Sequence, residues 1–259
     1  MIVILVCLSA LLSPWYVTQD AFQMNLGDRL ASPSREHILG TDNYGRDIFT
    51  RILLGSSIAM QVALAAVSVA FIIGVPLGGV SGYMGGFVDT VVMRVVDALL
   101  AFPGRLLAIA LVAATGTSFL TLCAAIGVNA IPGYTRVVRA AVLVQKEKEY
   151  VEAARMTGES GMRILFGEIF PNCLAPMFVL VTLDFAHAIL LESSLSFLGL
   201  GFAPPAPSWG LMLSEARGFM EIAPHVAIFP GLAISLTILG FNLLGDGLRD
   251  VFDPRQYES

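Results

Sequence analysis

The sequence predicts an all-α integral membrane protein with six transmembrane helices. Hydrophobic residues make up 56% of the 259 residues and charged residues only 14%. Soluble domains contain about 45–50% and 25% of these classes, so this chain has too few ionised groups to cover a water-exposed surface. Apolar runs close to the roughly 20 residues that cross a bilayer recur along the chain, and the charges gather between them.

Composition and charge also exclude several classes of function. The formal net charge of −5 argues against nucleic-acid binding, and the apolar content argues against disorder. Cys7, Cys123 and Cys173 stand singly in apolar stretches, which indicates small buried side chains and neither a disulfide nor a metal site. The sequence contains no GxxxxGK[ST] phosphate loop and no arrangement typical of a hydrolase. We therefore expect no enzyme and no bound cofactor.

The first expected span is the uncharged apolar run 2–17. It is short for a transmembrane helix, and a signal peptide is the competing interpretation. A signal peptide begins with basic residues, however, and only Met1 precedes this run. We therefore expect a first transmembrane helix whose cytoplasmic flank is missing from the sequence.

The second and third spans are predicted from the gaps between charges. Residues 58–80 form the second span. A turn-rich stretch of glycines from Gly78 to Gly86 is expected to end it. The uncharged run 106–135 is too short for two spans, so the third helix starts near residue 88 and carries Arg94, Asp97 and Arg105. Because Arg94 and Asp97 are three residues apart, they would share a helix face and pair.

The remaining spans follow in the same way. Residues 119–142 form the fourth span, 173–196 the fifth and 225–244 the sixth. Gly245 and Gly247 are expected to end the sixth span. Between the last two, residues 200–222 contain three prolines and predict a rigid external segment.

The distribution of Lys and Arg predicts the orientation of the chain. Residues 136–163 carry six such residues and the C-terminal tail carries Arg249 and Arg255, whereas the external segment 200–222 carries only Arg217. Both termini are therefore expected in the cytoplasm. The chain divides into a first helix with an external segment (1–51), a transmembrane core (52–250) with a cytoplasmic loop at 144–170, and a cytoplasmic tail (251–259).

The loop 144–170 contains the densest cluster of charges. Residues 149–156 are strong helix formers, and Gly158 is placed to end that helix in a left-handed conformation. A second helix is expected over 161–166, and Pro171 opens the fifth span. Composition alone leaves two interpretations open: a helix that docks on a partner protein, or an interfacial helix that anchors the loop to lipid.

Spacing favours the docking helix. The pattern resembles the "EAA" signature of ABC-importer permeases: Glu152, Ala153 and Ala154 are followed by Gly158 and, thirteen residues later, by Pro171. Glu168 and Phe170 depart from the consensus. Further blocks resemble the C-type permease subunit of dipeptide, oligopeptide and nickel importers. They are GTDNYGRD at 40–47, AFP at 101–103, SLSFLGLG at 194–201, PSWG at 207–210 and FNLLGDGLRD at 241–250.

The resemblance implies a type I ABC importer permease fold with a cytoplasmic coupling helix, in the bacterial inner membrane. The implied partners are a second homologous permease, two cytoplasmic ATPases, an external solute-binding protein and membrane lipid, with no nucleic acid. The implied cargo is a short peptide, with nickel as the nearest alternative. Residues of the signature would contact an ATPase subunit.

The external block 40–47 has two interpretations. Gly40 and Gly45 supply unusual backbone angles, and Asp42, Arg46 and Asp47 pair among themselves, which would make the block a polar turn. Alternatively, the same five residues dock the binding protein or line an outer gate.

Charges inside spans are costly and mark candidate substrate paths. Asp184, Glu192 and Arg105 belong to this class, although Glu192 also fits a structural role. Arg105 and Asp184 are expected to pair across the bundle or to line a hydrated path for a zwitterionic peptide. His187 shares the face of Asp184, and a metal-binding role for it is not favoured. A stand-alone proton-driven carrier using Asp184, Glu192 and His187 is the alternative from another class.

Overall fold

The computed structural model describes residues 1–16 and 21–252, and in this part of the chain the regular structure is helical, with one isolated bridge between Thr41 and Asp47. The helices, in chain order, are α1 (Ile2–Tyr16), η1 (Leu26–Asp28), α2 (Ile48–Met84), α3 (Gly86–Leu100), α4 (Gly104–Thr115), α5 (Phe119–Gln145), α6 (Glu149–Met156), α7 (Gly161–Arg163), the π-helix η2 (Ile164–Ile169), α8 (Phe170–Asn172), α9 (Leu174–Phe197), α10 (Trp209–Ala216), η3 (Arg217–Phe219) and α11 (His225–Phe252).

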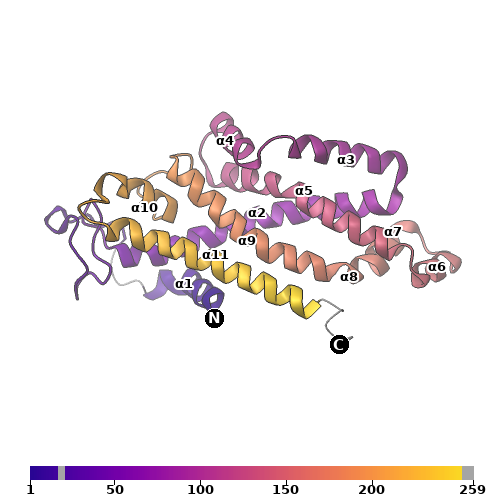
Figure 1. The fold of residues 1–259 in the computed structure, drawn as a ribbon, viewed down its shortest axis with the longest axis horizontal. Helices are drawn as coiled ribbons and strands as arrows, with labels where there is room; N and C mark the ends of the chain where they lie inside the picture. Colours follow the sequence, from indigo (N-terminus) through magenta and orange to yellow (C-terminus); the bar gives the residue numbers. More distant parts are fainter. Residues whose placement is uncertain (17–20, 253–259) are drawn as a thin grey trace.

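The long helices α2, α5, α9 and α11 run lengthwise through an elongated bundle (Figure 1). The segment before α2 and helix α10 gather at one end, which we call the α10 end. Helices α6 and α7 lie at the opposite end, the α6 end. The structure thus separates the two loops that the sequence places on opposite sides of a membrane.

Two apolar cores fill the bundle. One includes Ile48 and Trp209 toward the α10 end, and the other includes Val151 and Leu165 toward the α6 end. Cys123 and Cys173 are buried as expected, while Cys7 is half-buried, and all three are free thiols.

A stripe of glycines on α2 allows close packing against α5. Gly74, Gly78 and Gly82 recur every four residues, and a Cβ at Gly78 would lie 2.4 Å from the carbonyl oxygen of Thr135. The expectation that the glycines from Gly78 onward end the second span is therefore only partly right: Gly85, with φ +65°, ends α2, whereas Gly78 and Gly82 lie inside it. Helix α2 continues to Met84 because these glycines bury their backbone against a neighbouring helix, as small residues do in membrane helix pairs.

Gly78→Leu is expected to separate α2 from α5 and to destabilise the protein, because overpacking of a tight contact costs about 1–3 kcal/mol or more. The measurement is the thermal unfolding midpoint of the detergent-solubilised protein. Gly247→Leu is the matched control, since a Cβ at that exposed position of α11 meets no neighbour within 4 Å. Equal midpoints for the two variants would contradict this account of the packing.

The third span is broken, which corrects the expectation of one continuous helix. Helices α3 and α4 meet at 84° across residues 101–103. Pro103 stands directly before α4 and disfavours the helical conformation of Phe102, so α3 ends before it. The expected pairing of Arg94 with Asp97 is also wrong: Arg136 of α5 donates to the carboxylate of Asp97 at 2.6 Å, which ties α3 to α5.

Two further boundaries differ from the sequence prediction. Helix α11 runs past Gly245 to Phe252, because Gly245 is buried against Thr182 and Leu183 of α9 and serves packing rather than termination. The expected helix over 161–166 is instead the short α7 followed by a π-helix, and the fifth long helix opens at Leu174, beyond Pro171.

Three helices of the described chain, α2, α9 and α11, are long and apolar enough to cross a membrane, and the bent pair α3–α4 would make a fourth span. The apolar part of α1 is shorter, and α5 carries Arg136 and Arg139 and does not join this group. The six-span count stays a prediction, with α1, α2, α3–α4, α5, α9 and α11 as the six helical bodies.

Candidate transport pocket, coupling segment and external network

Helix α6 forms over residues Glu149–Met156, as the sequence predicts. Gly158 adopts φ +83°, which confirms the predicted left-handed stop, and its N–H donates to the carbonyl of Arg155 at 3.0 Å. Val151 is fully buried in the core at the α6 end, beside Ile164 and Leu165. Val151 therefore anchors the short helix to the body of the protein, with Tyr150 and Ala154 packed against the same core.

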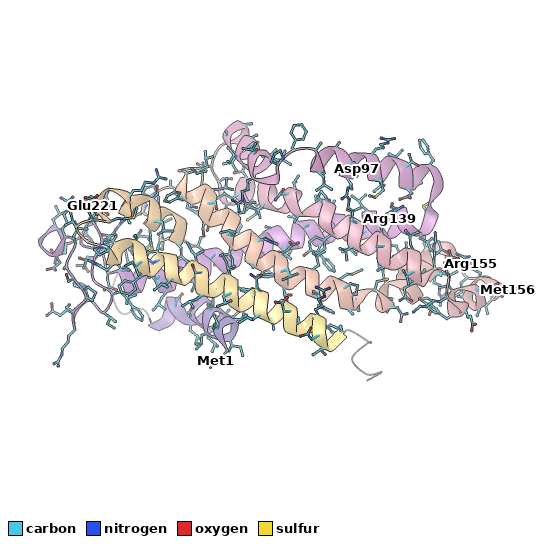
Figure 2. All side chains as sticks on the ribbon, viewed as in Figure 1. Met1, Asp97, Arg139, Arg155, Met156 and Glu221 are labelled. Atoms are coloured by element: carbon cyan, nitrogen blue, oxygen red, sulfur yellow. The ribbon has the colours of Figure 1, made fainter. Side chains whose placement is uncertain are left out.

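Much of the rest of α6 is exposed. Glu152, Ala153 and Arg155 are exposed and Ala154 is half-buried, while the Met156 side chain is 86% exposed. Figure 2 shows Arg155 and Met156 at the tip of the α6 end. An anchored helix with an open outer face is suited to contact another protein. Pro171 lies apart from this face, in α8 beyond the π-helix.

Polar contacts join the base of α6 to α5, and α5 in turn to α2 and α3. Lys146 at the end of α5 donates to the Gly82 carbonyl of α2 at 3.1 Å. Tyr150 donates a hydrogen bond to Gln145 Oε1 at 3.1 Å, and partial burial raises the pKa of the Tyr150 phenol, which keeps it a donor. Arg139 of α5 makes a two-point ion pair with Asp89 of α3, at 2.5 and 2.6 Å. A displacement of α6 would therefore be passed to several helices at once.

A buried ion network organises the α10 end. Arg46 donates to Asp42 at 2.6 Å and to Glu215 of α10 at 2.7 Å, and its side chain is 1% exposed. Arg51 of α2 lies 3.6 Å from Asp42 and 3.7 Å from Glu215. Two cations and two carboxylates thus bind the segment before α2 to helix α10.

The block 40–47 is a tight turn built on glycine. Gly40 and Gly45 have φ of +79° and +73°, and a Cβ at Gly45 would lie 1.7 Å from the carbonyl oxygen of Asn25. The expected pairing among Asp42, Arg46 and Asp47 is only partly right. Asp47 instead accepts from the Thr50 N–H at 2.8 Å, capping α2, and contacts His37 at 3.1 Å.

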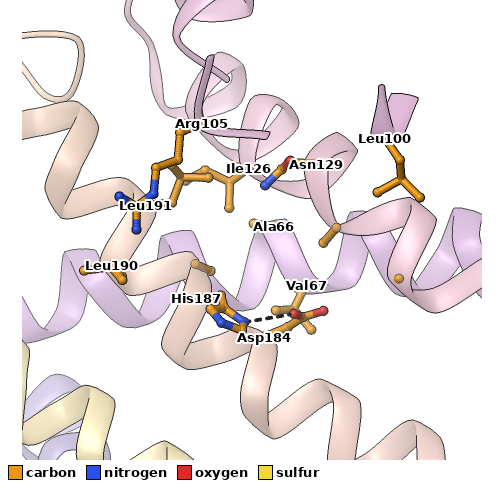
Figure 3. Close-up of a pocket in the computed structure, with 13 residues that line it drawn as sticks. Ala66, Val67, Leu100, Arg105, Ile126, Asn129, Asp184, His187, Leu190 and Leu191 are labelled. Carbon is orange, nitrogen blue, oxygen red and sulfur yellow. Dashed lines mark ion pairs between the residues drawn. The ribbon is translucent and has the colours of Figure 1, made fainter. Parts of the chain in front are cut away.

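A pocket of about 320 Å³ lies between α2, α4, α5 and α9. Arg105 in the first turn of α4, Asn129 of α5, and Asp184 and His187 of α9 line it, among apolar side chains such as Ile126 and Leu191 (Figure 3). The sequence expectation that Arg105 and Asp184 share a path is consistent with this placement. They do not pair with each other: Asp184 lies 3.6 Å from His187 Nδ1, and among the described residues Arg105 makes no ion pair.

Glu192 lies outside this pocket. Its carboxylate is 1% exposed and accepts hydrogen bonds from Ser196 at 2.7 Å and from Ser208 at 3.0 Å. Ser208 also caps α10, so Glu192 fixes the proline-rich segment to α9. The structure therefore brings together two of the three charged residues proposed for the substrate path.

Sequence reasoning missed three residues that the structure places at these sites. Asn129 has no charge to mark it inside a span, and it lies against Gly104, where a Cβ would come within 2.0 Å of its Oδ1. Glu215 lies far from Arg46 in sequence, so no spacing rule connects them. Met156 lies two residues beyond Ala154 and is not part of the "EAA" pattern. Within residues 1–16 and 21–252, no three His, Cys, Asp or Glu side chains gather as a metal site.

Apolar helices, a broken span and a charged pocket beside it are the features of a multi-pass membrane protein. Residues 74–257 match the family described as binding-protein-dependent transport system inner membrane components. The chain belongs to this family, and it is a transport permease rather than an enzyme.

Two curated relatives agree with this assignment. The dipeptide transport system permease protein DppC of Alkalihalophilus pseudofirmus is 45% identical over 248 residues, covering 96% of this chain and 82% of the relative. The glutathione transport system permease protein GsiD of Pectobacterium atrosepticum is 49% identical over 229 residues, covering 88% and 76%.

A solved structure of the MetNI methionine ABC transporter in an inward-facing conformation shares the fold. The TM-score is 0.64 at 17% identity, over 80% of this chain and 98% of that chain. The match confirms the predicted type I importer permease fold.

Proposed function

We propose that this chain is one of two homologous permeases that form the membrane path of an ATP-driven importer of short peptides. An external binding protein delivers the peptide, and two cytoplasmic ATPases drive transport. Support comes from the relatives, whose names specify dipeptide and glutathione transport. The proposed chain division is 1–51, 52–250 and 251–259, with both termini and the α6 end in the cytoplasm.

The observation that carries the proposal is the anchored, outward-facing helix α6. Glu152, Ala153, Ala154 and Gly158 would seat in a groove of an ATPase subunit, with Pro171 fixing where the following helix begins. A short helix held by Val151 moves as a rigid body, so closure of the ATPases would displace it and the helices bonded to its base.

For the block 40–47, we propose an indirect role at the external face. Asp42 and Arg46 are buried and paired, so they would shape the surface on which the binding protein docks rather than contact it. Gly40 and Gly45 would hold the turn, and Asp47 the start of α2.

The test is uptake by proteoliposomes that contain this chain with the subunits that co-purify with it and the binding protein. We expect ATP-dependent uptake of labelled dialanine. Uptake of nickel in place of dialanine would favour the alternative cargo of the same family. Uptake by this chain alone, abolished by a proton uncoupler, would establish the stand-alone carrier instead.

A further inference from the structure

We infer that the pocket between α4 and α9 is a dipolar site for the two free termini of a short peptide. Asp184 would receive the terminal ammonium group, and Arg105 the terminal carboxylate. This inference rests on the proposed function and assigns the chemistry by which the membrane path itself recognises its cargo.

The anionic end of the pocket is formed by α9. The Asp184 side chain is 16% exposed, and its ion-pair partner His187 lies at 3.6 Å with a side chain that is 76% exposed. A carboxylate accepts about four hydrogen bonds, so the His187 contact leaves acceptor capacity free even with the buried Tyr134 hydroxyl nearby. An ammonium group entering the pocket would find a partly desolvated acceptor there.

The cationic end is formed by α4. Arg105 is exposed and makes no ion pair within the described chain, and an unpaired charge within a membrane-spanning segment is costly. Helix α4 begins at Gly104, directly after the break, so the positive end of its dipole adds to the guanidinium charge. Asn129, which faces Gly104, supplies an amide beside the same end. A carboxylate is the complementary group.

The walls between these two ends suit a small zwitterion. Ala66, Ile126 and Leu191 present apolar surface, which lowers the local dielectric constant and strengthens both charge contacts. The volume of about 320 Å³ falls within the range of about 300–1,000 Å³ typical of small-ligand pockets. A free divalent cation fits less well, because Arg105 repels it and Asp184 with His187 offers only two ligands.

The test measures peptide binding to the complete permease–ATPase complex in nanodiscs. The binding protein is left out, so that only the membrane path discriminates among the peptides. The three probes are labelled dialanine, N-acetyl-dialanine and dialanine amide. We expect dialanine to bind about tenfold more tightly than either blocked peptide, as a charge-assisted contact of about 1.4 kcal/mol would give. In Asp184→Asn, dialanine should lose its preference over N-acetyl-dialanine but keep its preference over dialanine amide. In Arg105→Gln, it should lose its preference over dialanine amide and keep the other.

Asp97→Asn is the matched control, because it removes an ion-paired carboxylate outside the pocket, and it should leave both preferences intact. A structural role would weaken binding of all three probes equally, and that pattern would overturn the inference. The inference would also be overturned if the full importer takes up dialanine but the Asp184 and Arg105 variants lose neither preference. The proposed function would then still stand. Failure of the full importer to take up any peptide would instead refute the proposed function.

Discussion

Replacing Arg46 by Met is expected to lower the free energy of unfolding by about 3 kcal/mol, the largest stability effect we predict. Removing one partner from a buried ion network costs about 3–5 kcal/mol, because the remaining charges lose their compensation. Asp42 and Glu215 would both lose their short contact with Arg46. The effect falls at the lower end of this range, since Arg51 remains close to both carboxylates.

The measurement is denaturant unfolding in detergent, together with limited proteolysis of the segment before α2. Arg35→Met is the control, because it removes an exposed cation from the same segment. A variant at Arg46 as stable as the Arg35 variant would mean that the network does not hold α10 to the segment before α2.

Gly158→Val is expected to lower peptide uptake by about tenfold or more while ATP hydrolysis by the complex continues. A β-branched residue does not adopt φ +83° without strain of about 1–3 kcal/mol. The strain would displace the turn that ends α6, including the 3.3 Å hydrogen bond from the Glu159 N–H to the Ala154 carbonyl. The outer face of α6 would then meet the ATPase at the wrong angle.

The two readouts are taken on the same proteoliposomes, as uptake per ATP hydrolysed. Gly167→Val introduces the same side chain into the same loop, at a position with open space around its Cβ and no positive φ. It should leave the ratio near that of the unmodified protein. Normal coupling in the Gly158 variant would show that transmission does not depend on this turn.

Local signals in the sequence were sufficient for the short helix and for most of the long ones. The boundaries of α6 and the conformation of Gly158 follow from propensity and from the need for a residue that tolerates positive φ. The same local reasoning failed at Gly78 and Gly245, because a glycine that ends a helix and a glycine that packs against another helix look alike in sequence.

The external block illustrates the same limit. The positions of Asp42 and Arg46, four residues apart, predicted their pairing, and the structure confirms it. Glu215, the second partner of Arg46, lies 169 positions further along the chain, and its contact depends on how α10 folds back.

The sequence by itself determined the class of protein: its apolar runs require a lipid environment, and its "EAA" spacing resembles the signature of ABC-importer permeases. Only the tertiary structure decided that Arg105 and Asp184 share a cavity while Glu192 does not. The physical reason is that hydropathy and helix propensity act along the chain, whereas a pocket forms from the directions of side chains on separate helices. Those directions depend on the break before α4 and on the packing of α5 and α9.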